Sequence, residues 1–350
     1  MINDEKYIKR CIELAANGLG NVAPNPMVGC IIVNNNTIIG EGYHVKYGES
    51  HAEVNAINSV KDKSQLKNST LYVNLEPCCH FGKTPPCTEI ILKYKIPKVI
   101  IGTTDCFIKV NCKGIEMLIK AGVDVKAGVL ENECKELNKR FFTFHEKKRP
   151  YIFLKWAQTT DGFIDAERNP QNIGSPVWIN DEITRLLVHK WRSEEQAIII
   201  GRVTAINDNP KLTTREWKGK NPLRIVLDKN LVLNENLNLL DGSTPTLVFT
   251  SISKSARKNT EYVLIDFSKN VPEEIIKELF KRNIQSLIIE GGKILLESFI
   301  KENLWDEVCI LIGNKNFGKG LEAPKIKGNL ISESFSENDK LYFYKNNQIK

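Results

Sequence analysis

The chain has 350 residues, of which 41% are hydrophobic and 26% are charged, and its formal net charge is +7. This composition is typical of a globular protein and excludes a disordered or fibrous chain. At this length we expect two domains, because one domain usually takes about 100–200 residues.

The stretch 1–18 is charged and amphipathic, it lacks an apolar signal core, and no eighteen apolar residues run together anywhere in the chain. We therefore expect a cytoplasmic protein with no membrane partner. In that compartment, nine cysteines indicate thiols or metal ligands in preference to disulfides. The positive charge is spread out without a dense Lys/Arg stripe. This pattern suits an anionic small molecule and argues against nucleic acid as a partner.

Alternating helix and strand patterns fill the first part of the chain. The predicted order is a helix at 5–18, a hairpin with strands near 27–33 and 37–43, a helix at 51–60, a strand at 69–75, a helix at 85–95, a strand at 98–104 and a helix at 114–123. One polar helix starting at 131 is expected to close this part, and 145–150 is interpreted as a linker. The alternation predicts an α/β layer fold for a domain spanning 1–146.

The second part, 150–350, is predicted to be another α/β domain. Its predicted order is a strand at 150–158, a helix near 180–192, strands at 196–201, 222–228, 244–250 and 261–267, a helix at 272–282, a strand at 285–290, a helix at 293–303 and a strand at 307–313. The segment 201–215 mixes Gly, Asp, Asn, Pro and Thr. It is interpreted either as a functional loop or as a long connection.

Two short runs carry candidate chemistry: "HAE" at 51–53 and "PCCHFGKTPPC" at 77–87. A catalytic zinc ion takes three protein ligands and leaves one position for water, and His51, Cys78 and Cys87 could supply these ligands. Glu53 would then take a proton from the attacking water and return it to a leaving amine.

Other cysteines and histidines have simpler interpretations. Single cysteines such as Cys11 and Cys309 are expected in the core, since a thiol packs as a small hydrophobic group. Cys79 and His80 lie between the proposed ligands and could compete with them; a structural zinc would need one of them as a fourth ligand. His189 is interpreted as structural.

An H-x-E run followed by Pro-Cys and a later Cys is the signature of zinc nucleobase deaminases. The wider context, "PNPMVGCIIV", "GEGYH", "HAEVNAI" and "LEPCCHFGKTPPC" with its longer cysteine spacing, resembles the bifunctional riboflavin-biosynthesis deaminase–reductase family over nearly the whole chain. The resemblance implies a cytidine-deaminase-like first domain and a dihydrofolate-reductase-like second domain. It implies zinc-dependent hydrolytic deamination of 2,5-diamino-6-(5-phosphoribosylamino)pyrimidin-4-one, followed by NADPH reduction of the ribosyl side chain to ribityl.

The same resemblance assigns binding roles by position. The substrate contacts it implies are Asn25, Lys83, Asp105, Arg192, Leu212, Arg215 and Glu290. The NADPH contacts it implies are Ala157, Trp178, Thr204, Asp208 and Gly292. Apart from the resemblance, Lys155 and Asp161 are interpreted either as polar groups near the hydride path or as a salt-bridged surface pair. The zinc ligands and the acid/base residue match His51, Cys78, Cys87 and Glu53.

Two positions depart from the family pattern: Phe107 replaces an asparagine, and Pro176 replaces the serine that precedes Trp178 by two residues. Each departure puts one substrate contact in question. An alternative is a zinc deaminase that acts on a tRNA or nucleoside base and has a non-reductase second domain. In the leading interpretation the partner is a phosphorylated pyrimidine, and we expect a homo-oligomer.

Overall fold

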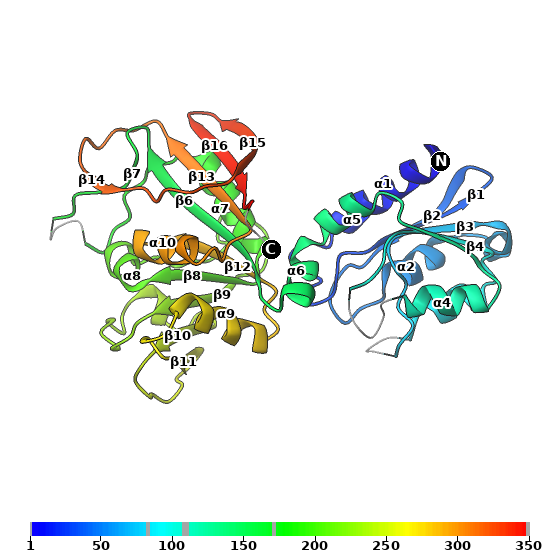
Figure 1. Ribbon diagram of the computed structural model, residues 1–350, viewed down its shortest axis with the longest axis horizontal. Helices are drawn as coiled ribbons and strands as arrows, with labels where there is room; N and C mark the ends of the chain where they lie inside the picture. Colours follow the sequence, from blue (N-terminus) through cyan, green and yellow to red (C-terminus); the bar gives the residue numbers. More distant parts are fainter. Residues whose placement is uncertain (1, 82–84, 107–111, 170–172, 348–350) are drawn as a thin grey trace. The chain divides into compact units, whose positions relative to one another are not determined.

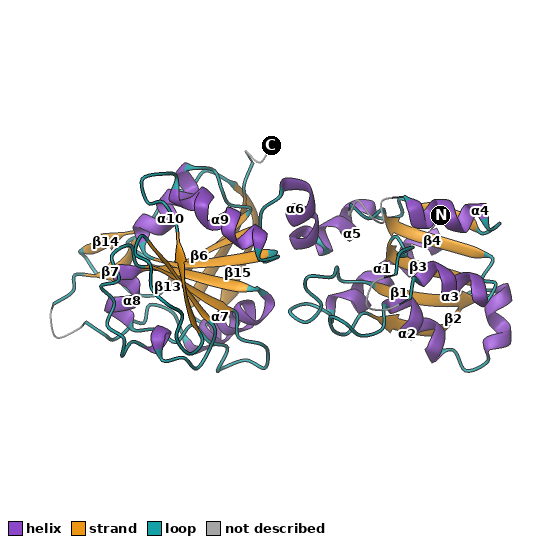
Figure 2. Cartoon of the chain, turned by 90° about the horizontal axis from the view of Figure 1, so that it is seen from below, coloured by secondary structure: helices purple, strands orange, loops and turns teal. Residues whose placement is uncertain are grey.

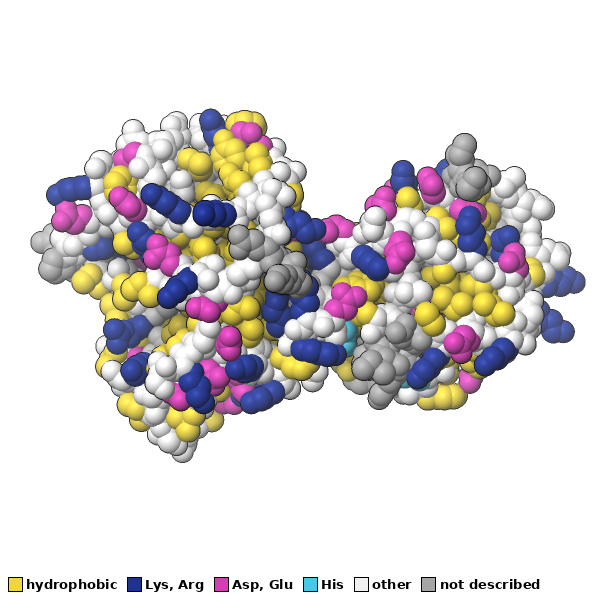
Figure 3. All heavy atoms as spheres, viewed as in Figure 1, with side chains coloured by type: hydrophobic (Ala, Val, Ile, Leu, Met, Phe, Trp, Pro, Cys, Tyr) yellow, Lys and Arg dark blue, Asp and Glu magenta, His cyan; other side chains and the backbone are white. Residues whose placement is uncertain are grey.

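The computed structural model describes residues 2–81, 85–106, 112–169 and 173–347. It forms two compact units, Met1–Lys148 and Arg149–Lys350, and each unit is a sheet flanked by helices (Figures 1 and 2). On the face of each unit that Figure 3 shows, charged side chains of both signs are interspersed. None of the helices in the described part of the chain has the length and apolar character that crossing a membrane requires.

The first unit is built on a five-stranded sheet with the strand order β2-β1-β3-β4-β5. The strands are β1 (Gly29–Asn34), β2 (Thr37–Tyr43), β3 (Thr70–Leu75), β4 (Lys98–Thr103) and β5 (Asp124–Ala127). β1 pairs antiparallel with β2 and β3, whereas β3, β4 and β5 run parallel. Parallel pairing brings the carboxyl ends of β3 and β4 to the same edge of the sheet.

Both faces of this sheet are buried, and the side chains along each strand alternate between them. The helices are α1 (Ile2–Ala16), α2 (Ala52–Ser59), α3 (Cys87–Lys93), α4 (Lys113–Lys120), α5 (Glu131–Leu137) and α6 (Lys139–Lys147), with a 3₁₀ segment at Lys63–Asn68. Ile32 and Val73 pack with α2, α3 and α4 in one core, whereas Ile31 and Tyr72 pack with α1 and α5 in another. Because successive side chains point to opposite faces, one strand serves both cores.

The single helix expected from residue 131 is wrong: the structure has α5 and α6, which meet at Asn138. The Asn138 side chain is buried. Its Oδ1 accepts a hydrogen bond from the Met27 N–H at 2.8 Å, and its Nδ2 donates to the Met27 carbonyl at 2.9 Å. An asparagine that bonds backbone groups competes with helix continuation. This tertiary contact therefore ends one helix and starts the next.

The second unit is built on a nine-stranded sheet with the order β11-β10-β9-β8-β12-β6-β13-β16-β15. The strands are β6 (Tyr151–Thr159), β8 (Ala197–Gly201), β9 (Leu223–Leu227), β10 (Thr246–Thr250), β11 (Thr260–Leu264), β12 (Ser286–Gly291), β13 (Glu307–Gly313), β15 (Asn329–Ser336) and β16 (Asp339–Lys345). From β11 to β13 all neighbours are parallel, and β16 and β15 add antiparallel pairs at one edge. β7 (Phe163–Ala166) and β14 (Gly320–Glu322) form a separate antiparallel pair.

Helices cover both faces of the nine-stranded sheet. They are α7 (Glu182–Glu194), α8 (Arg202–Asp208), α9 (Val271–Lys281) and α10 (Lys293–Lys301), with a 3₁₀ segment at Asn238–Leu240. α9 and α10 contribute to the core with Leu154 and Ile289, and α7 and α8 contribute to the core with Phe153 and Ile288. The near-continuous apolar strands are those expected of a parallel sheet buried on both faces.

The structure adds elements that the sequence patterns did not predict. The segment 201–215 begins with the short helix α8, whose Ala205 is buried in the core. Valine, threonine and asparagine in this helix have low intrinsic helix propensity, so tertiary packing decides its conformation. The pairs β7–β14 and β15–β16 were also not predicted, because their strands carry many polar residues.

Candidate active sites

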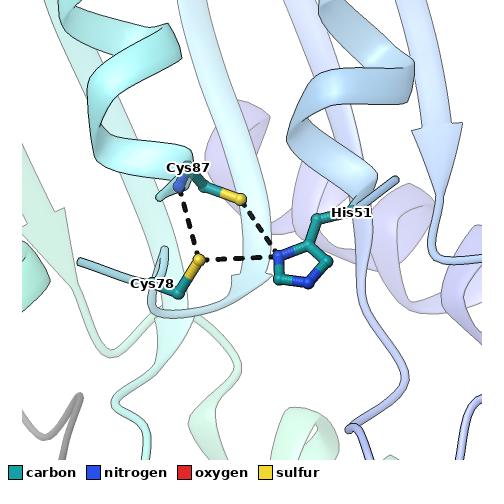
Figure 4. Close-up of side chains that lie close together, drawn as sticks. All are labelled: His51, Cys78 and Cys87. Carbon is teal, nitrogen blue, oxygen red and sulfur yellow. Dashed lines mark hydrogen bonds between the residues drawn. The ribbon is translucent and has the colours of Figure 1, made fainter. Parts of the chain in front are cut away.

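Three side chains from three segments of the first unit converge on one point (Figure 4). His51 immediately precedes α2, Cys78 follows β3, and Cys87 is the first residue of α3. The His51 Nδ1 atom lies 3.3 Å from the Cys87 Sγ and 3.5 Å from the Cys78 Sγ. Their ligand atoms all lie within 4.8 Å of one another, and this group comprises no other described residue. Two thiolates and an imidazole at this spacing fit a zinc ion.

Hydrogen bonds favour the thiolate form of Cys78. The Cys87 N–H donates to the Cys78 Sγ at 3.3 Å. The hydrogen bond from the Cys87 thiol, together with those from the His51 ring and the Cys87 N–H, lowers the pKa of Cys78 to about 4. Because the thiolate is the form that ligates a metal, the site is electrostatically prepared for a cation.

Glu53 lies in the first turn of α2, beside the three ligands, and is only 3% exposed. Burial, reinforced by the nearby Cys78 thiolate, raises the pKa of Glu53. A raised pKa brings a carboxyl group closer to the pH at which it can both take up and release a proton. This property is what a general acid/base requires.

A buried histidine fixes the orientation of Asn25. The His44 Nδ1 lies 3.1 Å from the Ser50 carbonyl, which can only accept a hydrogen bond, and therefore carries the proton. The His44 Nε2 then accepts from the Asn25 Nδ2 at 3.2 Å, because burial lowers the pKa of His44 and favours the neutral ring. The Asn25 Oδ1 remains as an acceptor for a substrate N–H.

Of the remaining residues expected from the sequence in the first unit, Asp105 is described by the structure. Asp105 lies just beyond β4 and is 7% exposed. Lys83 and Phe107 lie outside the described residues.

Glu76 was not singled out from the sequence, although it stands directly after β3 and two residues before Cys78. Its Oε2 accepts the N–H groups of Asp105 and Cys112 at 3.2 and 3.0 Å, and its Oε1 accepts those of Gly114 and Ile115 at 3.0 and 3.3 Å. A carboxylate at the first turn of α4 satisfies N–H groups that the helix leaves unpaired. Glu76 thereby joins the metal-ligand loop to the segment that carries Asp105.

The second unit holds a cavity of about 1160 Å³ at the carboxyl ends of the parallel strands β6, β8, β9 and β12. It brings together the residues for which the family resemblance implied contact with NADPH or with the sugar-phosphate substrate. These lining residues are Ala157, Trp178, Arg192, Thr204, Asp208, Leu212, Arg215, Glu290 and Gly292. Residues up to 135 positions apart in the chain thus share one cavity.

A buried ion-pair network occupies one wall of this cavity. Arg192 donates from Nε to Glu290 Oε1 at 2.8 Å and from Nη2 to Glu290 Oε2 at 2.5 Å, and the Lys155 Nζ lies 3.8 Å from Glu290 Oε2. Burial alone would raise the pKa of Glu290. The cations Arg192 and Lys155 outweigh it and lower that pKa to about 2. Burial lowers the pKa of Lys155.

Glycine is required where β12 turns into α10. Gly292 has a φ of +75°, and a Cβ on Gly291 would lie 3.1 Å from the Thr204 Cγ2. The close approach keeps the start of α10 against α8. Backbone N–H groups at such a helix start can bind phosphate.

Asp208 is held by an arginine that the sequence reading did not single out. The Arg168 Nη2 donates to Asp208 Oδ1 at 2.5 Å, and its Nε donates to both oxygens of Asp165 at 2.9 Å. Burial raises the pKa of Asp208. The Arg168 Nη1 also donates to the Ser175 carbonyl, next to Pro176, which itself lines the cavity.

The structure adds detail to two interpretations made from the sequence. His189, interpreted as structural, is buried and lines the cavity, and burial together with Arg192 and Arg215 lowers its pKa to about 4. Asp161 is not among the lining residues; it accepts hydrogen bonds from Thr159 and from the N–H groups of Phe317 and Gly318. Asp161 follows β6 at a turn, so its role is to hold a loop.

The fold and the two sites together define a class of protein, in which a cytidine-deaminase-like zinc unit precedes a reductase-like α/β unit on one chain. Family models support both parts. The cytidine and deoxycytidylate deaminase zinc-binding region matches residues 1–103, and the RibD C-terminal domain matches residues 150–338.

Whole-chain relatives show the particular family. The chain is 40% identical to the riboflavin biosynthesis protein RibD of Aquifex aeolicus, covering 95% of this chain and 92% of that protein. It is 38% identical to the RibD of Bacillus amyloliquefaciens, covering 93% and 88% of the two chains. A Thermotoga maritima structure, described as a diaminohydroxyphosphoribosylaminopyrimidine deaminase/5-amino-6-(5-phosphoribosylamino)uracil reductase, matches with a TM-score of 0.89 at 37% identity and covers 99% of both chains. The chain belongs to the RibD family, and the expected fold class is confirmed.

Exchanging either of two adjacent cysteines for serine tests the ligand set. We expect Cys78→Ser to reduce bound zinc well below about one ion per chain, because a serine hydroxyl does not replace a thiolate. Cys79→Ser is the matched control and should keep its zinc. The measurement is zinc content by mass spectrometry of metals after gel filtration. Equal zinc loss in both variants would contradict the assignment.

A second prediction concerns the pH dependence of the Glu290 network. Because the pKa of Glu290 is depressed to about 2 from its ordinary 4.5, its ion pairs stabilise the fold above about pH 4.5 and lose this effect as the pH falls towards 2. We expect Glu290→Gln to lower the unfolding free energy of the second unit by about 3–5 kcal/mol at pH 7, and less at pH 3.

Tryptophan fluorescence measures this unit selectively, because all five tryptophans lie in residues 149–350. Glu297→Gln is the control: Glu297 is 48% exposed and lies 3.8 Å from Lys293, so its loss should cost less than about 1 kcal/mol. If Glu290→Gln lowered the unfolding free energy equally at pH 3 and at pH 7, the lowered pKa of Glu290 would be contradicted.

Proposed function

We propose that this chain is a bifunctional enzyme of riboflavin biosynthesis. In this proposal residues 1–146 deaminate 2,5-diamino-6-(5-phosphoribosylamino)pyrimidin-4-one, and residues 150–350 reduce the ribosyl side chain of the product to ribityl with NADPH. The observation that carries the proposal is the presence, on one chain, of the His51, Cys78 and Cys87 group beside Glu53 and of the lined cavity of the second unit.

In the deaminase step, Glu53 moves the protons. A bound zinc ion would supply acidity to a water molecule, so that water can attack at neutral pH. Glu53 takes the proton of the attacking water and delivers it to the amino group as the carbon–nitrogen bond breaks and ammonia leaves. Its burial beside the ligands supports this role, because a raised pKa lets one carboxyl group both accept and donate.

Substrate orientation in the first unit is assigned to Asn25, Lys83 and Asp105. The acceptor oxygen of Asn25, held by His44, suits an N–H of the diaminopyrimidine ring. Asp105, at the carboxyl end of β4, is proposed to bind polar groups of the ribose arm. Lys83 is proposed to bind the phosphate as a point charge.

In the reductase step, NADPH supplies the hydride. Ala157, Trp178, Thr204, Asp208 and Gly292 are proposed to bind this cofactor. Arg192, Leu212, Arg215 and Glu290 are proposed to bind the sugar-phosphate substrate. Arg215 forms an ion pair with its neighbour Glu216, and its guanidinium is proposed to bind the phosphate. Lys155, close to Glu290 and with a lowered pKa, is positioned to hold the proton that accompanies the hydride.

The alternative functions have less support. A deaminase for tRNA or nucleoside bases with a non-reductase second domain does not account for the family match over residues 150–338. A structural zinc would need a fourth protein ligand, whereas the group found in the described part of the chain contains three. The similarity to RibD proteins therefore favours catalysis in both units.

We also propose a cytoplasmic homo-oligomer. The buried thiols of Cys11, Cys30 and Cys309 support a reducing compartment. β15 supports self-association, because it is the edge strand of the nine-stranded sheet and exposes Leu330 at 51%, Ile331 at 50% and Phe335 at 69%. An exposed apolar edge strand is a ready template for pairing with another chain.

A coupled assay tests the two activities and their order. We expect ammonia from the diaminopyrimidinone without NADPH, and NADPH oxidation once the cofactor is added. Glu53→Gln should lose deamination by about a thousandfold or more while it keeps zinc and still reduces the deaminated substrate. Retained deamination in that variant would rule out the proposed proton carrier, and no ammonia from zinc-loaded wild type would rule out the substrate.

Phe335→Glu tests self-association through β15. We expect a smaller mass by light scattering than the wild type has at the same concentration, because a charge at the centre of an apolar contact opposes pairing. Ser334→Glu, on the same exposed strand, adds the same charge without removing an apolar side chain and serves as the control. An unchanged mass for Phe335→Glu would exclude β15 from the interface.

A further inference from the structure

Arg224 lies in β9 and does not line the cavity, yet it is 0% exposed and is one of the largest fully buried side chains of the protein. A guanidinium has five N–H donors in a fixed planar fork. A buried charge of this kind requires a partner for each donor, since unpaired donors are costly away from water.

All five donors of Arg224 have acceptors. Nε donates to Thr246 Oγ1 at 3.0 Å. Nη1 donates to the carbonyls of Lys211 and Asn238 at 3.3 and 2.9 Å. Nη2 donates to Asp241 Oδ1 at 3.2 Å and to the Thr244 carbonyl at 2.9 Å. One side chain thus ties β9 to two connections, the one that precedes it and the one that follows it, and to β10, and a planar five-donor fork suits this arrangement.

Two of these acceptors belong to the wall of the cavity, since Lys211 and Asn238 both line it. Asn209 reinforces the connection: the Asn238 N–H donates to Asn209 Oδ1 at 2.8 Å, and the Asn238 Nδ2 donates to the Asn209 carbonyl at 2.6 Å. The wall formed by residues 209–212 is therefore held from behind by hydrogen bonds to Arg224 and Asn238.

This wall needs such support because of its backbone. Asn209 has a φ of +42° and Leu212 a φ of +53°, both in the left-handed region. A leucine in this region is strained and keeps the conformation only when the surroundings impose it. Leu212 lines the cavity, and its neighbour Lys211 is bonded through its carbonyl to Arg224.

We infer that Arg224 is a positioning residue for the reductase: it holds the 209–212 wall in its strained conformation and thereby determines affinity for the phosphorylated pyrimidine substrate. This inference rests on the proposed function, in which Leu212 contacts that substrate. Residues proposed to bind NADPH are held separately, since Asp208 pairs with Arg168 and Gly292 lies at the start of α10. A change at Arg224 should consequently affect one substrate more than the other.

Arg224→Lys tests the inference, because lysine keeps the charge but offers three donors at one point in place of the fork. We expect the KM for 5-amino-6-(5-phosphoribosylamino)uracil to rise about tenfold or more, and the KM for NADPH to stay within about threefold. Deamination by the first unit of the same chain should be unchanged, and it reports that the first unit is intact.

Arg282→Lys is the matched control. Arg282 also donates from all three nitrogens, to Glu278 at 2.9 Å and to Glu261 at 2.9 and 2.5 Å, but neither it nor its partners line the cavity. We expect a similar loss of thermal stability or less, with both KM values unchanged. A merely structural role for Arg224 would give this same result.

Thr246→Val provides a second variant if Arg224→Lys does not fold. This substitution removes the hydroxyl that accepts from the Arg224 Nε, and Thr246 does not line the cavity. We expect a smaller rise, about threefold to tenfold, in the KM for the phosphorylated pyrimidine alone. Unchanged KM values, or equal rises for both substrates, would overturn the inference. Wild-type protein that does not oxidise NADPH would instead refute the proposed function, and the inference with it.

Discussion

Both candidate sites depend on the parallel pairing of strands, which brings their carboxyl ends to one edge of a sheet. In the first unit β3 leads to Glu76 and Cys78, and its parallel neighbour β4 leads to Asp105. In the second unit β12 ends at Glu290 and Gly291, between β8 and β6. Loops that leave the same edge meet in space, and this edge is where open α/β sheets bind ligands.

The charged groups of the two sites have opposite net charge. In the first unit His51, Cys78 and Cys87 gather two thiols and an imidazole with Glu53 close by, so a cation completes the charge balance. In the second unit the carboxylate of Glu290 already has two cationic neighbours. A metal therefore suits the first site, whereas the second is suited to anionic organic groups because its surplus charge is positive.

Behind each site a fully bonded charged residue fixes the geometry. Glu76 accepts four backbone N–H groups, and Arg224 donates to five acceptors, three of them backbone carbonyls. The sequence does not reveal either role, because most of the partners are backbone groups of segments that are distant in the chain. Asn138 is likewise bonded to a backbone group that is distant in the chain. Its contact with Met27 divides a helix that periodicity alone predicts as continuous.

The sequence by itself determined the alternation of strands and helices, because burial on one or both faces imposes periods that can be read along the chain. It also predicts the candidate zinc ligands, since His51, Cys78 and Cys87 lie within local motifs of fixed spacing. The place of His189 in the cavity lining, the hydrogen bonds of Asp161 to a loop, and the contacts of Arg168 and Arg224 with cavity-lining segments can be seen only in the folded chain. Those roles depend on which segments the sheet order brings together, and sheet order is a property of long-range packing.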